Sequence, residues 1–492
     1  MHVSSESLLN IRRQLVRWPP RRVVELMTAA IIALALGYVI LGGDSRTLAG
    51  VIGVPFIVAL AVVSPEIIIL LILCMVLGVL PPAANPYLRL AGKGLYPSDL
   101  MLMSLLGVVG LRLLADRKFR FVHTPLDVPM LLLLGAVLVA VYTAITAHGI
   151  TLSNTTYEAR ILLYYALFFA VTNLIRTQAQ LDRLIVGVTI IAILAALLML
   201  AQSFAGLSFS LSGQELLQEA GIVRVFHPGT MAILAIMMVR LSGLGLREGQ
   251  CPALGDILML LVLSLSLLVT LGRNLLISGS IALLLLIVLI FRSHLSSFIT
   301  RGLMVAVAVA VLVGMLVLSG HGAPVMRYLA AFQERLSQLD SGSILSASGS
   351  LDWRWREVQY AWALLQNSPV FGIGVATAYR LPFYPGDPLT RYLHNAYLSL
   401  WLKTGIVGLI AFLWLCFRFL QRGFTCWSRP QHPSRRATVL GFTIAFFATM
   451  ISNLVAPFFV QDWGLALFAT MFGINEVIFA QSMTSPKQGT GG

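Results

Sequence analysis

The chain has 492 residues, of which 58% are hydrophobic and only 11% are charged, and its mean hydropathy is +0.88. This composition excludes a soluble fold of this length and indicates a polytopic membrane protein. The formal net charge of +14 could suggest a nucleic-acid partner. Most basic residues, however, fall in segments predicted to be cytoplasmic, so the positive-inside bias explains the charge and no nucleic acid is expected.

Apolar windows of roughly 17 to 22 residues, the length that crosses about 30 Å of hydrocarbon, recur along most of the chain. They predict an all-α, polytopic integral membrane bundle of about 12 to 14 transmembrane helices, in which the short windows at 47–64 and 66–80 are the weakest. The windows are 23–43, 47–64, 66–80, 98–115, 127–147, 160–176, 184–206, 227–245, 253–272, 274–291, 302–320, 396–418, 438–460 and 463–481.

Residues 1–22 are basic, and the apolar run after them lacks a small-residue cleavage site, so they are interpreted as a cytoplasmic segment before a retained first span. Alternating the spans from there places about eleven of them in 23–320, a long outer loop at 321–395, about three more in 396–481 and a cytoplasmic tail at 482–492. The shorter outer loops then fall at 44–46, 81–97, 148–159, 207–226, 272–273 and 461–462.

The four cysteines fall in predicted spans or on the predicted cytoplasmic side, so no disulfide framework is expected. They are Cys74, Cys251, Cys416 and Cys426. The sequence also shows no Walker-type phosphate loop, no Cys or His metal signature and no Gly-x-Ser-x-Gly elbow. No metal or cofactor is therefore expected.

The segment 321–395 is the one long polar interval of the chain. Long loops are exempt from the positive-inside rule, so its arginines need another explanation. A basic, aromatic loop against a membrane indicates an anionic, lipid-linked substrate. The arginines are Arg327, Arg335, Arg354, Arg356, Arg380 and Arg391.

Two helices are predicted within this loop. Apolar residues at helical spacing between Val325 and Leu339 indicate a helix lying on the membrane surface or on the bundle. A second helix is expected from Asp352, a good N-cap, to Asn367, where Pro369 stops it. The proline-rich stretch after Gly374 is long enough to form a mobile flap.

Five residues could carry chemistry, and each also has a plain structural interpretation. Arg273, between two apolar spans, could snorkel to the interface or face a phosphate. Arg354 and Glu357 share a helix face and could form a surface ion pair or grip an anion. His394 could be a structural histidine or a proton acceptor near neutral pH. Lys403, roughly 13 Å further along the next helix, could snorkel or serve function.

Three elements follow in order over about 135 residues: Arg273 in a Thr-x-x-Arg setting, then Arg354-x14-Pro369-Val370-Phe371-Gly372-Ile373-Gly374, then His394-Asn395-x2-Leu398-x2-Trp401-Leu402-Lys403-Thr404-Gly405-Ile406-Val407-Gly408. Together they resemble the signature region of the O-antigen ligase and polymerase superfamily. The arrangement of many spans with one large outer loop before the last few fits the same family over the whole chain.

The resemblance implies a GT-C-like glycosyltransferase of the bacterial inner membrane with a large, helical periplasmic loop and a periplasmic active site. Such an enzyme takes a glycan from undecaprenyl diphosphate and joins it to a saccharide or lipid A-core acceptor in lipopolysaccharide or exopolysaccharide biosynthesis, without metal or nucleotide. By position, Arg273 and Arg354 would bind the diphosphate and stabilise it as the leaving group. His394 would bind the acceptor hydroxyl or act as general base. The substrate-binding candidates around them are Arg356, Glu357, Arg380, Arg391, Asn395 and Lys403.

Ligase and polymerase remain equal alternatives here, because both use the same kind of donor. Two other classes compete with them. A transporter or flippase would carry its basic residues along a translocation path, whereas here they gather in one loop. A noncatalytic subunit of an envelope assembly would tolerate substitution of the candidate residues.

Overall fold

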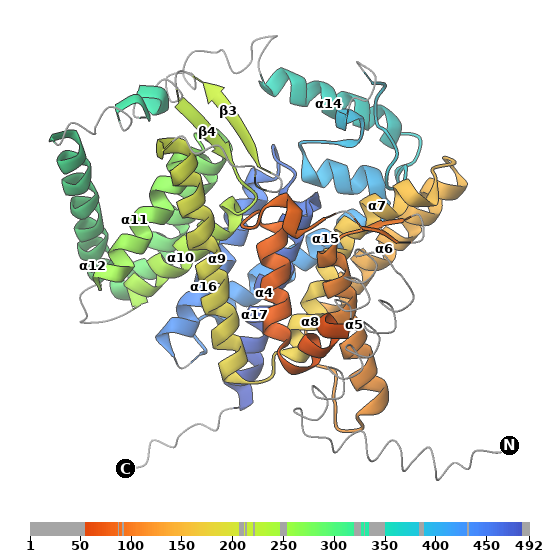
Figure 1. Ribbon diagram of the computed structural model, residues 1–492, viewed down its shortest axis with the longest axis horizontal. Coiled ribbons are helices and arrows are strands. Elements are labelled where there is room, and N and C mark those ends of the chain that lie inside the picture. Colours follow the sequence, from red (N-terminus) through yellow and green to blue (C-terminus); the bar gives the residue numbers. More distant parts are fainter. Residues whose placement is uncertain are drawn as a thin grey trace, which may run out of the picture.

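The fold is seen in a computed structural model, shown in Figure 1. The residues that it describes are 55–86, 88–90, 93–205, 211, 214–219, 222–246, 253–318, 326–328, 330–333, 350–382, 388–430 and 432–484. The predicted first span at 23–43, both terminal segments and most of the predicted helix at 325–339 lie outside these residues. Within that last segment, residues 326–328 and 330–333 are helical.

The described part of the chain is mainly helical, as predicted. Residues 55–63 form a helix that is followed by the named elements. The helices are α4 (Pro65–Val76), α5 (Pro97–Ala115), α6 (Asp127–Thr146), α7 (Leu152–Leu163), α8 (Leu167–Leu174), α9 (Gln178–Ala205), α10 (Thr230–Leu246), α11 (Leu254–Val269), α12 (Arg273–Leu318), α14 (Ser350–Leu365), α15 (Ala396–Cys426), α16 (Pro433–Ser452) and α17 (Asp462–Thr484). Short 3-10 helices are η1 (Pro82–Ala84), η2 (Tyr164–Ala166), η4 (Pro388–Arg391) and η5 (Phe458–Val460).

Local sequence explains where several helices begin. Proline occupies the first turn of α4, α5 and α16, where its fixed φ suits the helix and its missing N–H is not needed. The side chain of Asn395 accepts a hydrogen bond of 3.0 Å from the Leu398 amide and so caps α15.

Among the described residues, six helices are long and apolar enough to cross a membrane: α5, α6, α9, the first part of α12, α15 and α17. The helices α4, α10 and α11 are also apolar but shorter. The prediction of a polytopic helical membrane protein is therefore confirmed. α12 runs as one helix of 46 residues through both windows predicted at 274–291 and 302–320, so the structure shows no turn between these two predicted spans.

The structure adds two β-hairpins within the predicted outer loops. Strand β1 (Leu88–Leu90) pairs with β2 (Lys93–Leu95), and β3 (Glu215–Glu219) pairs with β4 (Ile222–Phe226), both antiparallel. The predicted outer loop at 148–159 is largely the helix α7. Figure 1 shows α7, α14 and the β3–β4 hairpin toward one end of the bundle, which we call the loop end.

The start of α15 is tied to the core of the bundle. The Ala396 amide donates to the Asn453 carbonyl at 3.0 Å, and the Tyr397 hydroxyl donates to the Met450 carbonyl at 2.7 Å. Below this point, buried aromatic rings from α15, α16, η5 and α17 pack edge-on or tilted, with Phe412, Phe446 and Phe459 at the centre. His394, two residues before α15, is therefore attached to a rigid part of the fold.

Candidate functional site

His394 and Glu357 form the centre of the site. Glu357 lies on α14, and His394 stands two residues before α15. The histidine Nδ1 lies 2.9 and 3.0 Å from the two carboxylate oxygens, and the His394 amide also donates to Oε2 at 3.2 Å. Glu357 is 1% exposed. Because a carboxylate accepts, this contact favours the tautomer with the proton on Nδ1 and leaves the Nε2 lone pair free to accept a proton.

Tyr379 completes the hydrogen bonding of this carboxylate. Its hydroxyl donates to Glu357 Oε1 at 3.4 Å, and the ring is buried. Burial and the neighbouring carboxylate raise the pKa of Tyr379 to about 12, so the phenol keeps its proton at neutral pH. The adjacent Arg380 guanidinium lies 5.4 Å from the Trp353 ring and donates to the Leu381 carbonyl at 3.0 Å.

Arg354 lies one helical turn before Glu357, and it is electrostatically coupled to Arg273. Burial and the positive charge of Arg273 lower the pKa of Arg354, while Glu357 and Tyr392 act in the opposite direction. A guanidinium nevertheless keeps its charge. Within the residues that the structure describes, neither Arg273 nor Arg354 has a hydrogen bond or an ion pair to its guanidinium. The site thus holds two guanidinium groups that make no hydrogen bond or ion pair with a described carboxylate, although Glu357 acts on Arg354 electrostatically.

Arg273 is presented by a strained turn between α11 and α12. Leu271 has φ +47° and is buried, a conformation that costs a side chain roughly 1–2 kcal/mol. The turn is fixed because Arg224, on β4, donates to the Thr270 carbonyl at 3.3 Å and Gly272 donates to the Thr270 hydroxyl at 3.2 Å. Arg273 is the first residue of α12, so its charge adds to the positive end of the helix dipole.

The Pro369–Gly374 motif docks into a break in α15. Gly405 interrupts that helix with φ +71°, and there the Ile406 amide donates to the Pro369 carbonyl at 3.1 Å while the Ile373 amide donates to the Leu402 carbonyl at 2.7 Å. A Cβ on Gly405 would collide with the Val370 carbonyl. The glycine is therefore required by both the backbone angle and the close approach.

Gly374 allows a second close approach. Its φ is +81°, and a Cβ there would lie 2.6 Å from the Ala144 nitrogen and 2.8 Å from the Ala140 carbonyl oxygen of α6. The next amide, that of Val375, donates to the same Ala140 carbonyl at 3.4 Å. Gly374 and Gly405 thus let the segment pack between α6 and α15.

Lys403 has a partner that the sequence does not reveal. Its ammonium forms an ion pair with Glu158 of α7, and the other carboxylate oxygen of Glu158 accepts from the Ala376 amide. Lys403 is 9% exposed. Its charge is therefore engaged by the protein, which argues against the interpretation as a snorkelling lysine.

The structure also gives the positions of the remaining candidate residues. Arg356 is exposed and forms an ion pair of 3.0 Å with Asp352. Asp352 lies inside the first turn of α14, so the predicted start of that helix is wrong by two residues. Arg391 is exposed in η4, and Asn395 caps α15. No ion pair joins Arg354 to Glu357, whose carboxylate instead faces His394.

Sequence reasoning missed Glu158, Tyr379 and Tyr392. The Tyr392 ring stacks edge-on against His394 with centroids 5.0 Å apart. One sequence feature could have indicated Glu158 as a partner of Lys403. Glu158 is an acidic residue next to an apolar window, and Lys403 is a basic residue inside another apolar window. Their pairing could not be read without knowing that α7 and α15 meet.

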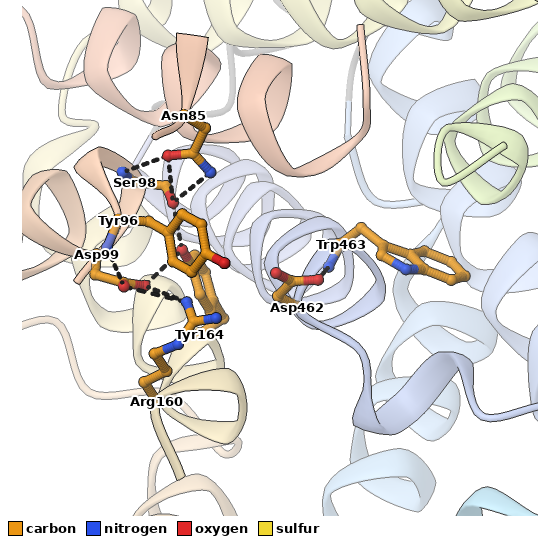
Figure 2. Close-up of polar contacts among 8 residues, drawn as sticks. All are labelled: Asn85, Tyr96, Ser98, Asp99, Arg160, Tyr164, Asp462 and Trp463. Atoms are coloured by element: carbon orange, nitrogen blue, oxygen red, sulfur yellow. Dashed lines mark hydrogen bonds and ion pairs between the residues drawn. The ribbon is translucent and has the colours of Figure 1, made fainter. Parts of the chain in front are cut away.

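A second polar cluster at the loop end holds α7 in place, as Figure 2 shows. Arg160 forms an ion pair of 3.1 Å with Asp99 of α5 and lies 4.3 Å from the Tyr96 ring centroid. The Tyr164 hydroxyl donates to Asp99 at 2.9 Å and lies 2.9 Å from the Ser98 hydroxyl. This network fixes the helix that carries Glu158.

Two comparisons with known proteins bear on this geometry. Residues 258–413 match a family model described as O-Antigen ligase. The matched region includes Arg273, Arg354, Glu357 and His394, and it ends within α15. Among curated proteins, no match to the chain is found.

Proposed function

We propose that this chain, a membrane protein of the O-antigen ligase and polymerase superfamily, transfers a glycan from undecaprenyl diphosphate to an acceptor hydroxyl at the periplasmic face of the bacterial inner membrane. At the coarser level, the family match supports a membrane glycosyltransferase of the ligase or polymerase type. The observation that carries the finer proposal is the His394–Glu357 pair next to two guanidinium groups without described partners.

The two arginines suit a diphosphate leaving group. As the glycosidic C–O bond breaks, the electron pair moves to the diphosphate, and negative charge develops there. Guanidinium groups that are already in place stabilise that charge without reorganisation, and their planar forks match phosphate oxygens. Arg273 and Arg354 come from α12 and α14, so binding the donor would also join the bundle to the loop.

His394 suits the acceptor side of the same reaction. The acceptor oxygen attacks the anomeric carbon, its proton passes to His394 Nε2, and undecaprenyl diphosphate leaves. Glu357 holds the other ring nitrogen and would stabilise the imidazolium that forms. Tyr379 stays protonated and donates to Glu357, so this carboxylate is oriented from a second side.

The energy source and the partners follow from this chemistry. The lipid-linked diphosphate is already activated, so no nucleotide is needed outside the cytoplasm. The proposed acceptor is a saccharide, either on lipid A-core or on a second lipid-linked repeat. Arg356, Arg380, Arg391 and Asn395 remain proposals for contacts to the glycan or the diphosphate.

The competing interpretations predict a different distribution of groups. A flippase would need charged or polar groups along a path through the bundle, whereas the candidate residues lie at the loop end, at the start of α12 and, for Lys403, about two turns into α15. A noncatalytic subunit has no need for a buried carboxylate that orients a histidine. The His394–Glu357 geometry therefore favours the enzyme.

Deleting the gene should separate ligase from polymerase. If the chain is a ligase, long polymer should accumulate on undecaprenyl diphosphate, because chain growth continues while transfer stops. If it is a polymerase, single repeat units should accumulate. Mass spectrometry and gels of the extracted carrier lipid measure the length. An unchanged profile of carrier-linked glycan would contradict both.

A further inference from the structure

We infer that Glu158 is a positioning residue: by accepting the Ala376 amide hydrogen bond while it pairs with Lys403, it holds the 373–379 segment so that Tyr379 and Glu357 orient His394. The inference rests on the proposed function for its kinetic consequence. The contact itself does not depend on which reaction the site performs.

The first observation is the conformation of the segment that Glu158 holds. Ala376 is not glycine, yet it has φ +63°, and it is buried. Such a conformation persists where neighbouring contacts impose it. Here the Ala376 amide donates to Glu158 Oε2, and the preceding amide of Val375 donates to the Ala140 carbonyl of α6.

The second observation is what lies three residues further along. The Tyr379 amide donates to the Thr390 carbonyl at 2.9 Å, and the Tyr379 hydroxyl donates to Glu357, the partner of His394. A hydrogen-bonded path therefore runs from Glu158 through the backbone to the histidine. None of its steps requires Glu158 to touch the substrate.

The third observation is that Glu158 is presented rigidly. The Arg160–Asp99 ion pair anchors the C-terminal part of α7 to α5, and the Tyr164–Asp99 hydrogen bond anchors η2, which follows α7 directly. Figure 2 shows Arg160 and Tyr164 converging on Asp99. Lys403, next to the break in α15, supplies the positive charge that a partly buried carboxylate needs.

Two double variants isolate the acceptor role from the ion pair. Glu158→Gln with Lys403→Met keeps an oxygen that can accept from Ala376 and leaves no unpaired charge. Glu158→Ala with Lys403→Met also leaves no unpaired charge but removes the acceptor. We expect the Ala variant to have a kcat for glycan transfer roughly 10- to 100-fold below that of the Gln variant. The KM for the lipid-linked donor should be equal, because Arg273 and Arg354 are unchanged.

Hydrogen exchange of the full-length protein in detergent provides a readout that needs no reaction. Amides of 373–379 should exchange faster in the Ala double variant than in the Gln double variant. Glu476→Gln is the matched control, since it disturbs another buried ion pair, with Arg422, on the distant part of α15. That control should leave both the exchange of 373–379 and the kcat-to-KM pattern unchanged.

The outcomes separate this inference from the proposed function. Equal exchange in the two double variants, or equal kcat, overturns the positioning role. If the wild-type protein transfers no glycan while the exchange difference appears, the contact stands and the proposed function fails. A general loss of folded protein in both variants, with their kcat values equal per folded molecule, would show a purely structural ion pair and overturn the inference.

Discussion

Replacing His394 by alanine should abolish glycan transfer, lowering kcat by roughly 10²- to 10⁴-fold, the range for loss of a positioned general base. The donor KM should change little, since the arginines proposed to bind the diphosphate remain. Steady-state transfer by the purified variant measures both constants. His148→Ala is the matched control, because this histidine is exposed and follows α6 outside the site; it should behave as wild type.

The partnership with Glu357 sharpens this prediction. Since the carboxylate is proposed to act through the histidine, Glu357→Gln should lower kcat less than His394→Ala does. Adding Glu357→Gln to His394→Ala should lower kcat almost no further. Such non-additivity is expected of residues that act as a unit. Full activity of His394→Ala, or strictly additive losses in the double variant, would contradict the role given to the pair.

Replacing Arg354 or Arg273 by alanine should each lower kcat by roughly 10²- to 10³-fold, as expected when one group that stabilises transition-state charge is removed. Lysine should recover only part of the loss, because an ammonium keeps the charge but lacks the planar fork. Transfer rates with the lipid-linked donor measure these effects. The donor KM should also rise, in contrast to His394→Ala.

Arg327→Ala is the control for general loss of positive charge at the loop end, since Arg327 is exposed there and takes no part in the proposed site. It should retain activity. If Arg327→Ala lowered kcat as much as Arg354→Ala, the decrease would reflect general electrostatic attraction of the donor to the loop. The specific role proposed for Arg354 would then be contradicted. Raising the salt concentration would then reduce wild-type activity strongly as well.

The sequence predicted the helical class of the fold and several helix boundaries because apolar windows report burial in lipid directly. α5, α6 and α15 begin within a residue of the windows at 98–115, 127–147 and 396–418. The hairpin β3–β4 was missed because it falls in a segment interpreted only as a loop, although Ile222, Val223 and Val225 are β-branched residues that favour strands.

Within the site, ordered motifs indicated Arg273, Arg354 and His394, and the structure couples Arg273 to Arg354 and joins His394 to their neighbour Glu357. The partners were harder to predict. Helical spacing showed that Arg354 and Glu357 share a face of α14, but it could not show which tertiary partner the carboxylate meets. Spacing along a helix fixes a direction, whereas the neighbour in that direction depends on how separate elements pack.

The same limit applied to Lys403. The cost of burying a charge predicted that this lysine has a role, and depth along α15 was the only geometry that the sequence provided. Its partner Glu158 lies on a helix that the sequence showed only as a short outer loop. The break at Gly405 was visible only as one glycine within the family-like stretch from His394 to Gly408.

We propose that this chain itself catalyses glycan transfer from a lipid diphosphate. The most direct measurement uses the purified, full-length protein in lipid vesicles with an undecaprenyl diphosphate-linked glycan and a saccharide acceptor, followed by mass spectrometry. We expect wild-type protein to form the enlarged acceptor together with free undecaprenyl diphosphate in equal amounts, and His394→Ala protein to form neither. Absence of product with folded wild-type protein and either acceptor, lipid A-core or a second lipid-linked repeat, would contradict it.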